Sequence, residues 1–299
     1  MNHQSPIANV CRRALTIRMR TMLVATALTA AIAALGAPSV MAAPKGEYAA
    51  FAECPTSNAE LAACIVARAE GGAITFGDET VPVVNTQTLQ GGFIEEESGA
   101  LKFVAAANGN TLTKTAQKVP GGLSGLVNCT EISNKEEREN CEAIFENKLT
   151  GVYATVELAA PASDIGLNEF NLETEMGTAL SLPVKVKLEN PLLGNQCYIG
   201  SNSSPIVVPL TTGTSGSLKG KLGEISSRAE GGILVIKNDS LVNNTIAVPG
   251  ATGCGGIFSS IIDKIVDARL AIPAAAPKNK VTLNGTLEQT GAGAAREHE

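Results

Sequence analysis

Residues 178–213 read TALSLPVKVKLENPLLGNQCYIGSNSSPIVVPLTTG, and this stretch decides the fold. Apolar and polar positions alternate in its first half, from residue 180 to residue 189. A period of two is typical of a strand that has one face on a core and the other in water. A turn at residues 190–195 follows, and Cys197 then begins a second apolar run. The stretch therefore predicts a strand, a turn, a disulfide candidate and a second strand.

Similar alternating runs, separated by turns rich in glycine and asparagine, occupy most of the remaining chain. They predict one hairpin turned at Glu70-Gly71-Gly72 and another turned at Asn238-Asp239. The sequence RAEGG occurs at both 68–72 and 228–232, which indicates similar turn chemistry in two hairpins rather than a duplication. Two segments have helical spacing instead, at about 133–149 and about 256–270. We therefore expect a mainly β fold, an antiparallel β-sandwich or an irregular barrel, with these two helices packed on it.

The segment at 256–270 carries a wide apolar stripe, which suits either a protein core or a membrane surface. Its charges balance, because Asp263 and Asp267 are matched by Lys264 and Arg269. Membrane-surface helices usually carry a basic polar face. The balance therefore favours a helix that covers one end of the β core.

The first 42 residues have the three parts of a secretory signal peptide. Four arginines precede an apolar run at 22–35, and a Val40-x-Ala42 end follows it. The alternative is an uncleaved signal anchor, but the apolar run is short for a membrane span. We expect cleavage after Ala42, secretion of the mature chain, a single β-rich extracytoplasmic domain at 43–290 and a disordered tail at 291–299.

The charge balance narrows the choice of partners. The leader holds four of the 23 basic residues and none of the 29 acidic ones, so the rest of the chain has a net charge of 19 − 29 = −10. Such a chain will not bind nucleic acid by neutralising phosphates, and anionic lipid surfaces should repel it. No later stretch is long and apolar enough for a transmembrane anchor.

Six cysteines follow the leader: Cys54, Cys64, Cys129, Cys141, Cys197 and Cys254. An even number in a secreted chain predicts disulfides, although six cysteines allow about 15 connectivities. Proximity in sequence favours Cys54–Cys64 and Cys129–Cys141, which leaves Cys197–Cys254. A metal site is the competing interpretation, but it needs ligand-spaced cysteines and histidines. The sequence has no C-x-x-C, and its two histidines are His3 and His298, so we expect no metal.

The residues that most catalytic sites need are scarce. Without a histidine between His3 and His298, the Ser-His-Asp and Cys-His arrangements are excluded. No P-loop, dinucleotide fingerprint or G-x-S-x-G elbow occurs. A carboxylate pair that hydrolyses a glycoside stays open, although the chain has no tryptophan to hold sugar rings. We therefore assign no catalytic or cofactor-binding residue and no cofactor, and we expect a protein that is not an enzyme.

Three segments, at 45–55, 178–207 and 248–273, are similar to an uncharacterised family of secreted actinobacterial proteins. The pattern ENP-L-G-x-x-CYIGS within 178–207 is the most specific part of this resemblance. The resemblance implies an exported protein that contains disulfides. It implies no activity, so it transfers no functional residue to this chain.

These observations favour a secreted extracellular or cell-envelope protein with a structural or binding role. One alternative is a secreted hydrolase that uses only carboxylates, and another is a carrier that holds an apolar ligand in its β core. The expected partners are accordingly the cell wall or a small apolar ligand. The candidate binding loop follows Cys197 and includes Tyr198, Ser201 and Asn202.

Overall fold

The computed structural model describes residues 42–124, 133–136, 138–139 and 150–299. All helices and strands named below belong to the unit Ala43–Glu299. The strands are β1 Ala63–Phe76, β2 Glu79–Pro82, β3 Gln87–Glu95, β4 Leu101–Ala105, β5 Ala116–Val119, β6 Val152–Leu158, β7 Gly166–Leu167, β8 Leu180–Glu189, β9 Tyr198–Ile199, β10 Ile206–Leu210, β11 Thr214–Ser215, β12 Leu218–Lys219, β13 Glu224–Arg228, β14 Ile233–Asn243, β15 Ala251–Thr252 and β16 Lys280–Gly291. The α-helices are α3 Glu169–Thr174, α4 Ser259–Leu270 and α5 Ala292–Glu297, and the 3₁₀ helices are η1 Gly46–Phe51, η2 Gly122–Ser124, η4 Ala162–Asp164, η5 Ala229–Gly231 and η6 Gly256–Phe258.

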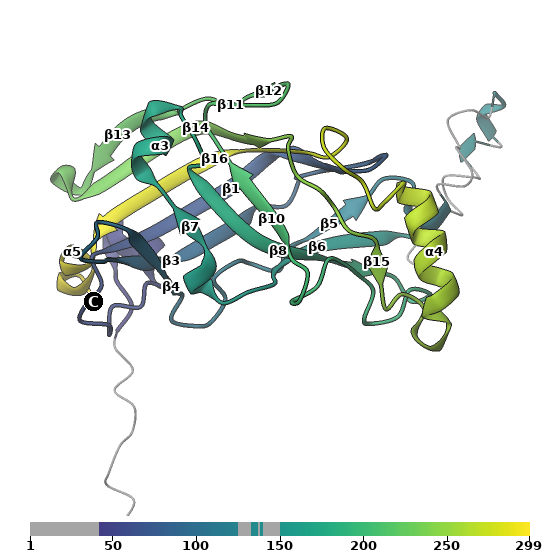
Figure 1. Ribbon diagram of the computed structural model, residues 1–299. Coiled ribbons are helices and arrows are strands. Elements are labelled where there is room, and N and C mark those ends of the chain that lie inside the picture. The colour runs from purple at the N-terminus through teal and green to yellow at the C-terminus, as the bar shows by residue number, and fades with distance from the viewer. Residues whose placement is uncertain (1–41, 125–132, 137, 140–149) are drawn as a thin grey trace, which may run out of the picture. The chain divides into compact units, whose positions relative to one another are not determined.

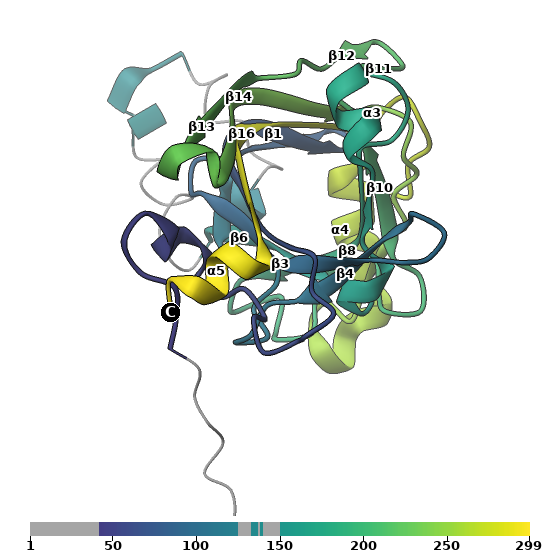
Figure 2. The same ribbon diagram turned by 90° about the vertical axis from the view of Figure 1, so that its left-hand side faces the viewer.

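The expected mainly β fold is confirmed, and its core is one antiparallel sheet of 14 strands. Neighbouring strands follow the order β14–β16–β1–β3–β4–β7–β8, and β10 pairs with the other edge of β8. Thr211, which directly follows β10, then exchanges two backbone hydrogen bonds with Val242 of β14, at 3.1 and 2.9 Å. The sheet therefore closes on itself, which is the irregular barrel of the two expected forms. Figure 2 looks along its interior. We call this arrangement the closed sheet.

Strand β8 is central to the closed sheet, as its alternation predicts. One edge of β8 pairs with β7 and β6, and the other edge pairs with β10 and β9. Its inward positions Leu182, Val186 and Leu188 are each at most 8% exposed, whereas Lys185 and Lys187 lie on the outer face. The sequence period of two thus becomes one apolar wall of the interior.

The two predicted hairpin turns at Gly71 and Asn238 are wrong. Strands β1 and β14 continue through these positions, each with a shift of register, between Ala69 and Gly71 and between Lys237 and Asp239. Such a shift is a β-bulge, which glycine and positive-φ asparagine favour as readily as a turn does. Of the two RAEGG segments, only the second forms a hairpin turn, as η5 between β13 and β14.

Strand β16 lies between β1 and β14 and explains both bulges. Its Gly285 faces the register shift of each neighbour. A Cβ on Gly285 would lie 1.8 Å from Arg68 O, so the backbones approach too closely for any side chain there. Three residues further along, Glu288 forms ion pairs with the arginines of both RAEGG segments, Arg68 at 3.6 Å and Arg228 at 2.6 Å.

A second, smaller core lies on the outer face of the sheet, between β1, β14, η1 and α5. It contains Phe51, Val66 and Ile233, all at most 3% exposed, and the disulfide Cys54–Cys64. The residues for which the sequence predicts a disordered tail complete this core, because Ala292 and Ala295 of α5 are buried.

Polar contacts also hold α5 in place. Arg296 donates from Nε to Thr56 O (2.9 Å) and from Nη2 to Asn58 O (2.6 Å). The rings of Tyr48 and His298 stack with their centroids 4.0 Å apart. These residues are far apart in sequence, so a local pattern could not predict that the tail is ordered.

The remaining sequence predictions divide between the described and the undescribed residues. The disulfides Cys54–Cys64 and Cys197–Cys254 are present, with Cα atoms 5.5 and 4.0 Å apart. The predicted helix at 256–270 is present as η6 and α4. The pair Cys129–Cys141 and most of the helix predicted at 133–149 lie outside the described residues, although residues 135, 136, 138 and 139 are helical.

Candidate functional site

The interior of the closed sheet holds an apolar cavity of about 270 Å³, and residues of α4 line part of it. Helix α4 lies at one end of the closed sheet (Figure 1). Strands β1, β2, β5, β6, β8 and β9 supply most of its wall. The wall includes the aliphatic residues Val81, Val119, Ala154, Val186, Leu188 and Ile199. Protein interiors are usually packed too tightly to leave such a space, and engineered apolar cavities of about 150 Å³ already hold a benzene molecule.

A second apolar cavity of about 100 Å³ lies further along the interior. Both cavities are lined by Ile74, Phe76, Val83, Val156 and Val186, so these five side chains separate one space from the other. We call this partition of five side chains the waist between the two cavities.

Asp239 lies at the wall of the second cavity and is only 6% exposed. Burial raises the pKa of this carboxyl to about 6, and the negative charge of Glu70 acts in the same direction. Hydrogen bonds from the backbone N–H groups of Gly285 and of Asp239 itself oppose the increase in pKa. The carboxyl is thus a buried titratable group beside a largely apolar cavity.

Helix α4 forms the end wall of the larger cavity, where Ile262, Val266 and Leu270 contribute to the lining. Two aspartates on α4 bind the segment around β15. Asp267 Oδ1 accepts a hydrogen bond from Ala251 N (2.6 Å), and Asp263 Oδ1 accepts one from Cys254 N (2.8 Å). The expectation that this helix covers one end of the β core is confirmed.

One ion pair lies in the wall of the larger cavity. Arg269 Nη2 of α4 is 3.1 Å from Glu79 Oε2 of β2. Burial raises the pKa of Glu79, although the charge and hydrogen bond of Arg269 act in the opposite direction. Arg269 Nε is buried and has no hydrogen-bond partner. A buried N–H without a partner is energetically costly, and a hydrogen-bond acceptor that reached it would remove that cost.

Gln117 is the third polar side chain of that wall, and its amide carries both donors and an acceptor. Its Oε1 accepts from Val84 N and Asn85 N, both at 3.0 Å, and its Nε2 donates to Asn85 O (2.6 Å). The amide therefore ties β5 to the chain after β2. It is not free to bind a ligand.

The predicted binding loop lies on the outer face of the closed sheet, away from both cavities. Lys185 Nζ lies 4.7 Å from the ring centroid of Tyr198 and 2.9 Å from Asn202 Oδ1. Ser201 Oγ accepts from Ser204 N (3.0 Å) within a tight turn. The structure thus brings Tyr198 and Asn202 together around a lysine, while Ser201 stabilises the turn.

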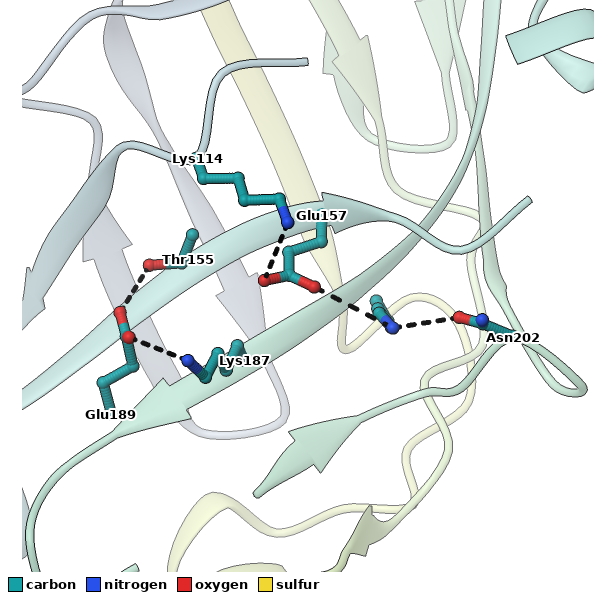
Figure 3. Close-up of polar contacts among 7 residues, drawn as sticks. Lys114, Thr155, Glu157, Lys187, Glu189 and Asn202 are labelled. Atoms are coloured by element: carbon teal, nitrogen blue, oxygen red, sulfur yellow. Dashed lines mark hydrogen bonds and ion pairs between the residues drawn. The ribbon is translucent and has the colours of Figure 1, made fainter. Parts of the chain in front are cut away.

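A network of charged residues continues from this loop across β6 and β8 (Figure 3). Glu157 lies 3.8 Å from both Lys185 and Lys114. Glu189 accepts from Thr155 Oγ1 (2.8 Å) and pairs with Lys187 at 3.1 Å. Burial alone would raise the pKa of Glu189, but these two hydrogen bonds hold it below its ordinary value.

These contacts bear on the carboxylate-hydrolase alternative. A glycoside hydrolase needs one carboxylic acid with a raised pKa beside a second carboxylate. On this outer face Glu157 and Glu189 are both paired with lysines, and the pKa of Glu189 is lowered. The arrangement is that of a surface ion-pair network rather than of an acid and its base.

Searches of the described residues for other kinds of site gave two results. In the described part of the chain, no helix is both long and apolar enough to cross a membrane. No cluster of three or more His, Cys, Asp or Glu side chains suited to a metal ion was found among those same residues.

Comparison with known proteins found no matching family model, no matching curated protein and no matching solved structure. The function is therefore argued from the cavities and their surroundings.

Sequence reasoning identified the inward faces of the strands and offered an apolar ligand in the β core as an alternative, but it did not identify the residues that line the cavities. Alternation predicts which side chains point inward, whereas a cavity depends on how far opposite walls are apart. The small residue Ala154 on an inward position of β6 is a local signal of unfilled space. The Glu79–Arg269 pair joins residues 190 positions apart, and no local pattern predicts it.

Proposed function

We propose that this chain is an exported, non-enzymatic binding protein that holds a small apolar molecule inside the closed sheet. One observation carries the proposal, the cavity of about 270 Å³ with its largely aliphatic wall. Ligand sites are typically concave, largely preformed and mostly apolar, with a few polar groups that orient the ligand. The cavity has all of these properties.

The size of the cavities indicates the kind of ligand. Burial of about 200 Å² of apolar ligand surface contributes roughly 5 kcal/mol, part of which offsets the loss of translational and rotational freedom. A ligand that fills only the larger cavity would therefore bind weakly. A longer chain that also passes the waist at Val156 and Val186 would gain more. We infer an elongated apolar molecule.

Arg269 indicates the chemistry of one end of that molecule. Its buried Nε has no partner in the protein, and it lies in a wall that is otherwise nearly all apolar. A carboxylate, ester or hydroxyl oxygen on the ligand would accept this hydrogen bond. A single-chain fatty acid or a related lipid has both the apolar length and the acceptor.

Export is the second part of the proposal. The arginine-rich leader with its apolar run supports it, as does the resemblance to secreted actinobacterial proteins. Two disulfides are typical of proteins that fold in an oxidising compartment. A carrier outside the cytoplasm would move an apolar molecule through or along the cell envelope.

The test starts with residues 43–299 purified with their disulfides intact. Mass spectrometry of an organic extract should detect a co-purifying lipid, and the delipidated protein should bind the apolar fluorophore 1-aminoanthracene. Val156→Phe adds volume at the waist between the cavities and should weaken that binding by about tenfold or more. Val207→Phe is the matched control, because Val207 lies on the outer face of β10 and is 52% exposed.

The proposal fails if the extract holds no lipid and Val156→Phe binds the fluorophore as tightly as the control does. If Val156→Phe does not fold, the smaller change Ala154→Val replaces it, because Ala154 also lines the larger cavity. Ala154→Val should then bind the fluorophore more weakly than both the wild type and Val207→Phe.

A further inference from the structure

Five large apolar side chains are exposed around the covered end of the larger cavity. They are Leu192 (67% exposed), Ile257 (91%), Phe258 (61%), Ile261 (59%) and Ile265 (50%). We call these five residues the apolar rim. Single exposed apolar residues are common on protein surfaces, but a contiguous group marks an interaction site.

The apolar rim is formed by two segments that a backbone hydrogen bond joins. Gly255 N donates to Leu193 O (2.7 Å), so the turn that carries Leu192 is joined to the start of η6. Ile257 and Phe258 belong to η6, and Ile261 follows directly in the first turn of α4. Ile265 is four residues after Ile261, which places both on the same face of the helix.

The apolar rim also connects the surface to the cavity. Leu192 and Ile265 line the larger cavity and are at least half exposed at the same time. A molecule that enters or leaves between these side chains keeps contact with apolar groups along the whole way. An apolar ligand that left through any polar part of the surface would pass through water instead.

The charges on α4 leave the apolar rim almost uncharged. Asp263 and Asp267 point to backbone N–H groups of residues 251–254, and Arg269 is paired with Glu79. Lys264 is the exposed charge that remains on this helix. An apolar face with one cation and no outward carboxylate is compatible with lipid head groups, which carry phosphate.

We infer that the apolar rim inserts into the surface of a lipid membrane, so that ligand passes between the membrane and the cavity beneath α4. The two faces of α4 then have separate roles, since its inner face closes the β core and its outer face contacts lipid. The route of the ligand rests on the proposed function, whereas membrane docking can be tested independently. Because the chain after the leader has a net charge of −10, the insertion is driven by apolar contact rather than by attraction to anionic lipid.

The first experiment measures flotation of residues 43–299 with phosphatidylcholine vesicles. Phe258→Glu should reduce the vesicle-bound fraction at least about tenfold, because it places a charge where an aromatic ring would enter the bilayer. Phe170→Glu is the matched control, since Phe170 of α3 is 66% exposed but lies outside the rim. Wild-type binding should change less than about twofold in roughly 0.5 M salt, because apolar insertion is not screened.

The second experiment follows transfer of a fluorescent fatty acid from the protein to the vesicles. The transfer rate should rise with vesicle concentration for the wild type and for Phe170→Glu. It should be slow and independent of vesicle concentration for Phe258→Glu. Phe258→Glu should still bind 1-aminoanthracene in solution, because residue 258 does not line the cavity.

Three outcomes would overturn the inference. The first is that the wild type does not float with vesicles. The second is that Phe258→Glu and Phe170→Glu lose vesicle binding equally. The third is that sedimentation shows a dimer of the wild type that Phe258→Glu dissociates. The last result would assign the apolar rim to an interface between two copies of the chain. Vesicle binding without any 1-aminoanthracene binding would instead sink the proposed function and leave the docking surface intact.

Discussion

The buried carboxyl of Asp239 gives the most direct quantitative prediction. It lies at the bulge of β14, where it accepts hydrogen bonds from the backbone N–H groups of Gly285 and of Asp239 itself. Burial and the nearby charge of Glu70 still raise its pKa from 3.8 to about 6. The folded protein therefore holds this proton more tightly than the unfolded chain does.

The sign of the pH dependence follows from that difference. Below about pH 3 the carboxyl is protonated in both states, and its contribution to stability is largest. As the pH rises through 3.8 toward 6 the unfolded chain loses the proton first, so the free energy of unfolding falls. About one pH unit above 6 the folded protein has lost the proton as well, and the free energy of unfolding stops falling. A shift from 3.8 to about 6 corresponds to a loss of at most about 3 kcal/mol.

Asp239→Asn removes the titration while it keeps an oxygen that can accept the hydrogen bond from Gly285. Urea unfolding of wild type and variant, followed by circular dichroism from about pH 3 to about pH 8, should give equal stabilities at the acid end. Near neutral pH the variant should be more stable by roughly 1–3 kcal/mol. Asp164→Asn is the control, because Asp164 is exposed. A difference between wild type and Asp239→Asn that does not change with pH, or that favours the wild type at neutral pH, would refute the reasoning.

Three further predictions concern the backbone, the disulfide and the cavity wall. In urea unfolding, Gly285→Ala should destabilise the fold by about 3 kcal/mol or more, because its Cβ would lie 1.8 Å from a carbonyl oxygen. Gly293→Ala is the control. Its Cβ would meet no atom within 4 Å, so this variant should be neutral or slightly more stable. Removal of the Cys197–Cys254 disulfide by two serines opens a loop of 57 residues and should cost about 4 kcal/mol, and an unchanged urea midpoint would contradict this. Arg269→Lys keeps the charge opposite Glu79 but loses the free Nε–H, so titration should show about tenfold weaker binding of a fatty acid and unchanged binding of 1-aminoanthracene.

The sequence predicted those parts of the fold that depend on local periodicity. The alternation in residues 180–189 identified β8 and its inward face, and helical spacing identified α4. The disulfide Cys54–Cys64 followed from an even count and from proximity, and Cys197–Cys254 followed by elimination. The strand, the helix and the short disulfide loop each depend on a physical constraint that acts over a short part of the chain.

The failures have a common cause, which is that the deciding contact is distant in sequence. Glycines at residues 71 and 72 allow a turn or a bulge, and the choice depends on Gly285 of a strand more than 200 residues later. The tail forms α5 because Arg296 finds carbonyl oxygens at residues 56 and 58. The binding loop at Tyr198, Ser201 and Asn202 stays a prediction. Lys185 of β8 contacts Tyr198 and Asn202, and Ser201 accepts a hydrogen bond from Ser204 within its own turn.

The position of β16 has a consequence for how the chain folds. Every other strand precedes β16 in sequence, and β16 pairs along its length with β1 and with β14. Because synthesis proceeds from the N-terminus, β1 and β14 have open edges until residues 280–291 are present. Closure of the sheet and enclosure of the cavity are therefore among the last folding events. The edges of β1 and β14 that face β16 stay unpaired until then. An exported carrier built in this way would depend on a chaperone, or on rapid delivery, for as long as β16 is absent.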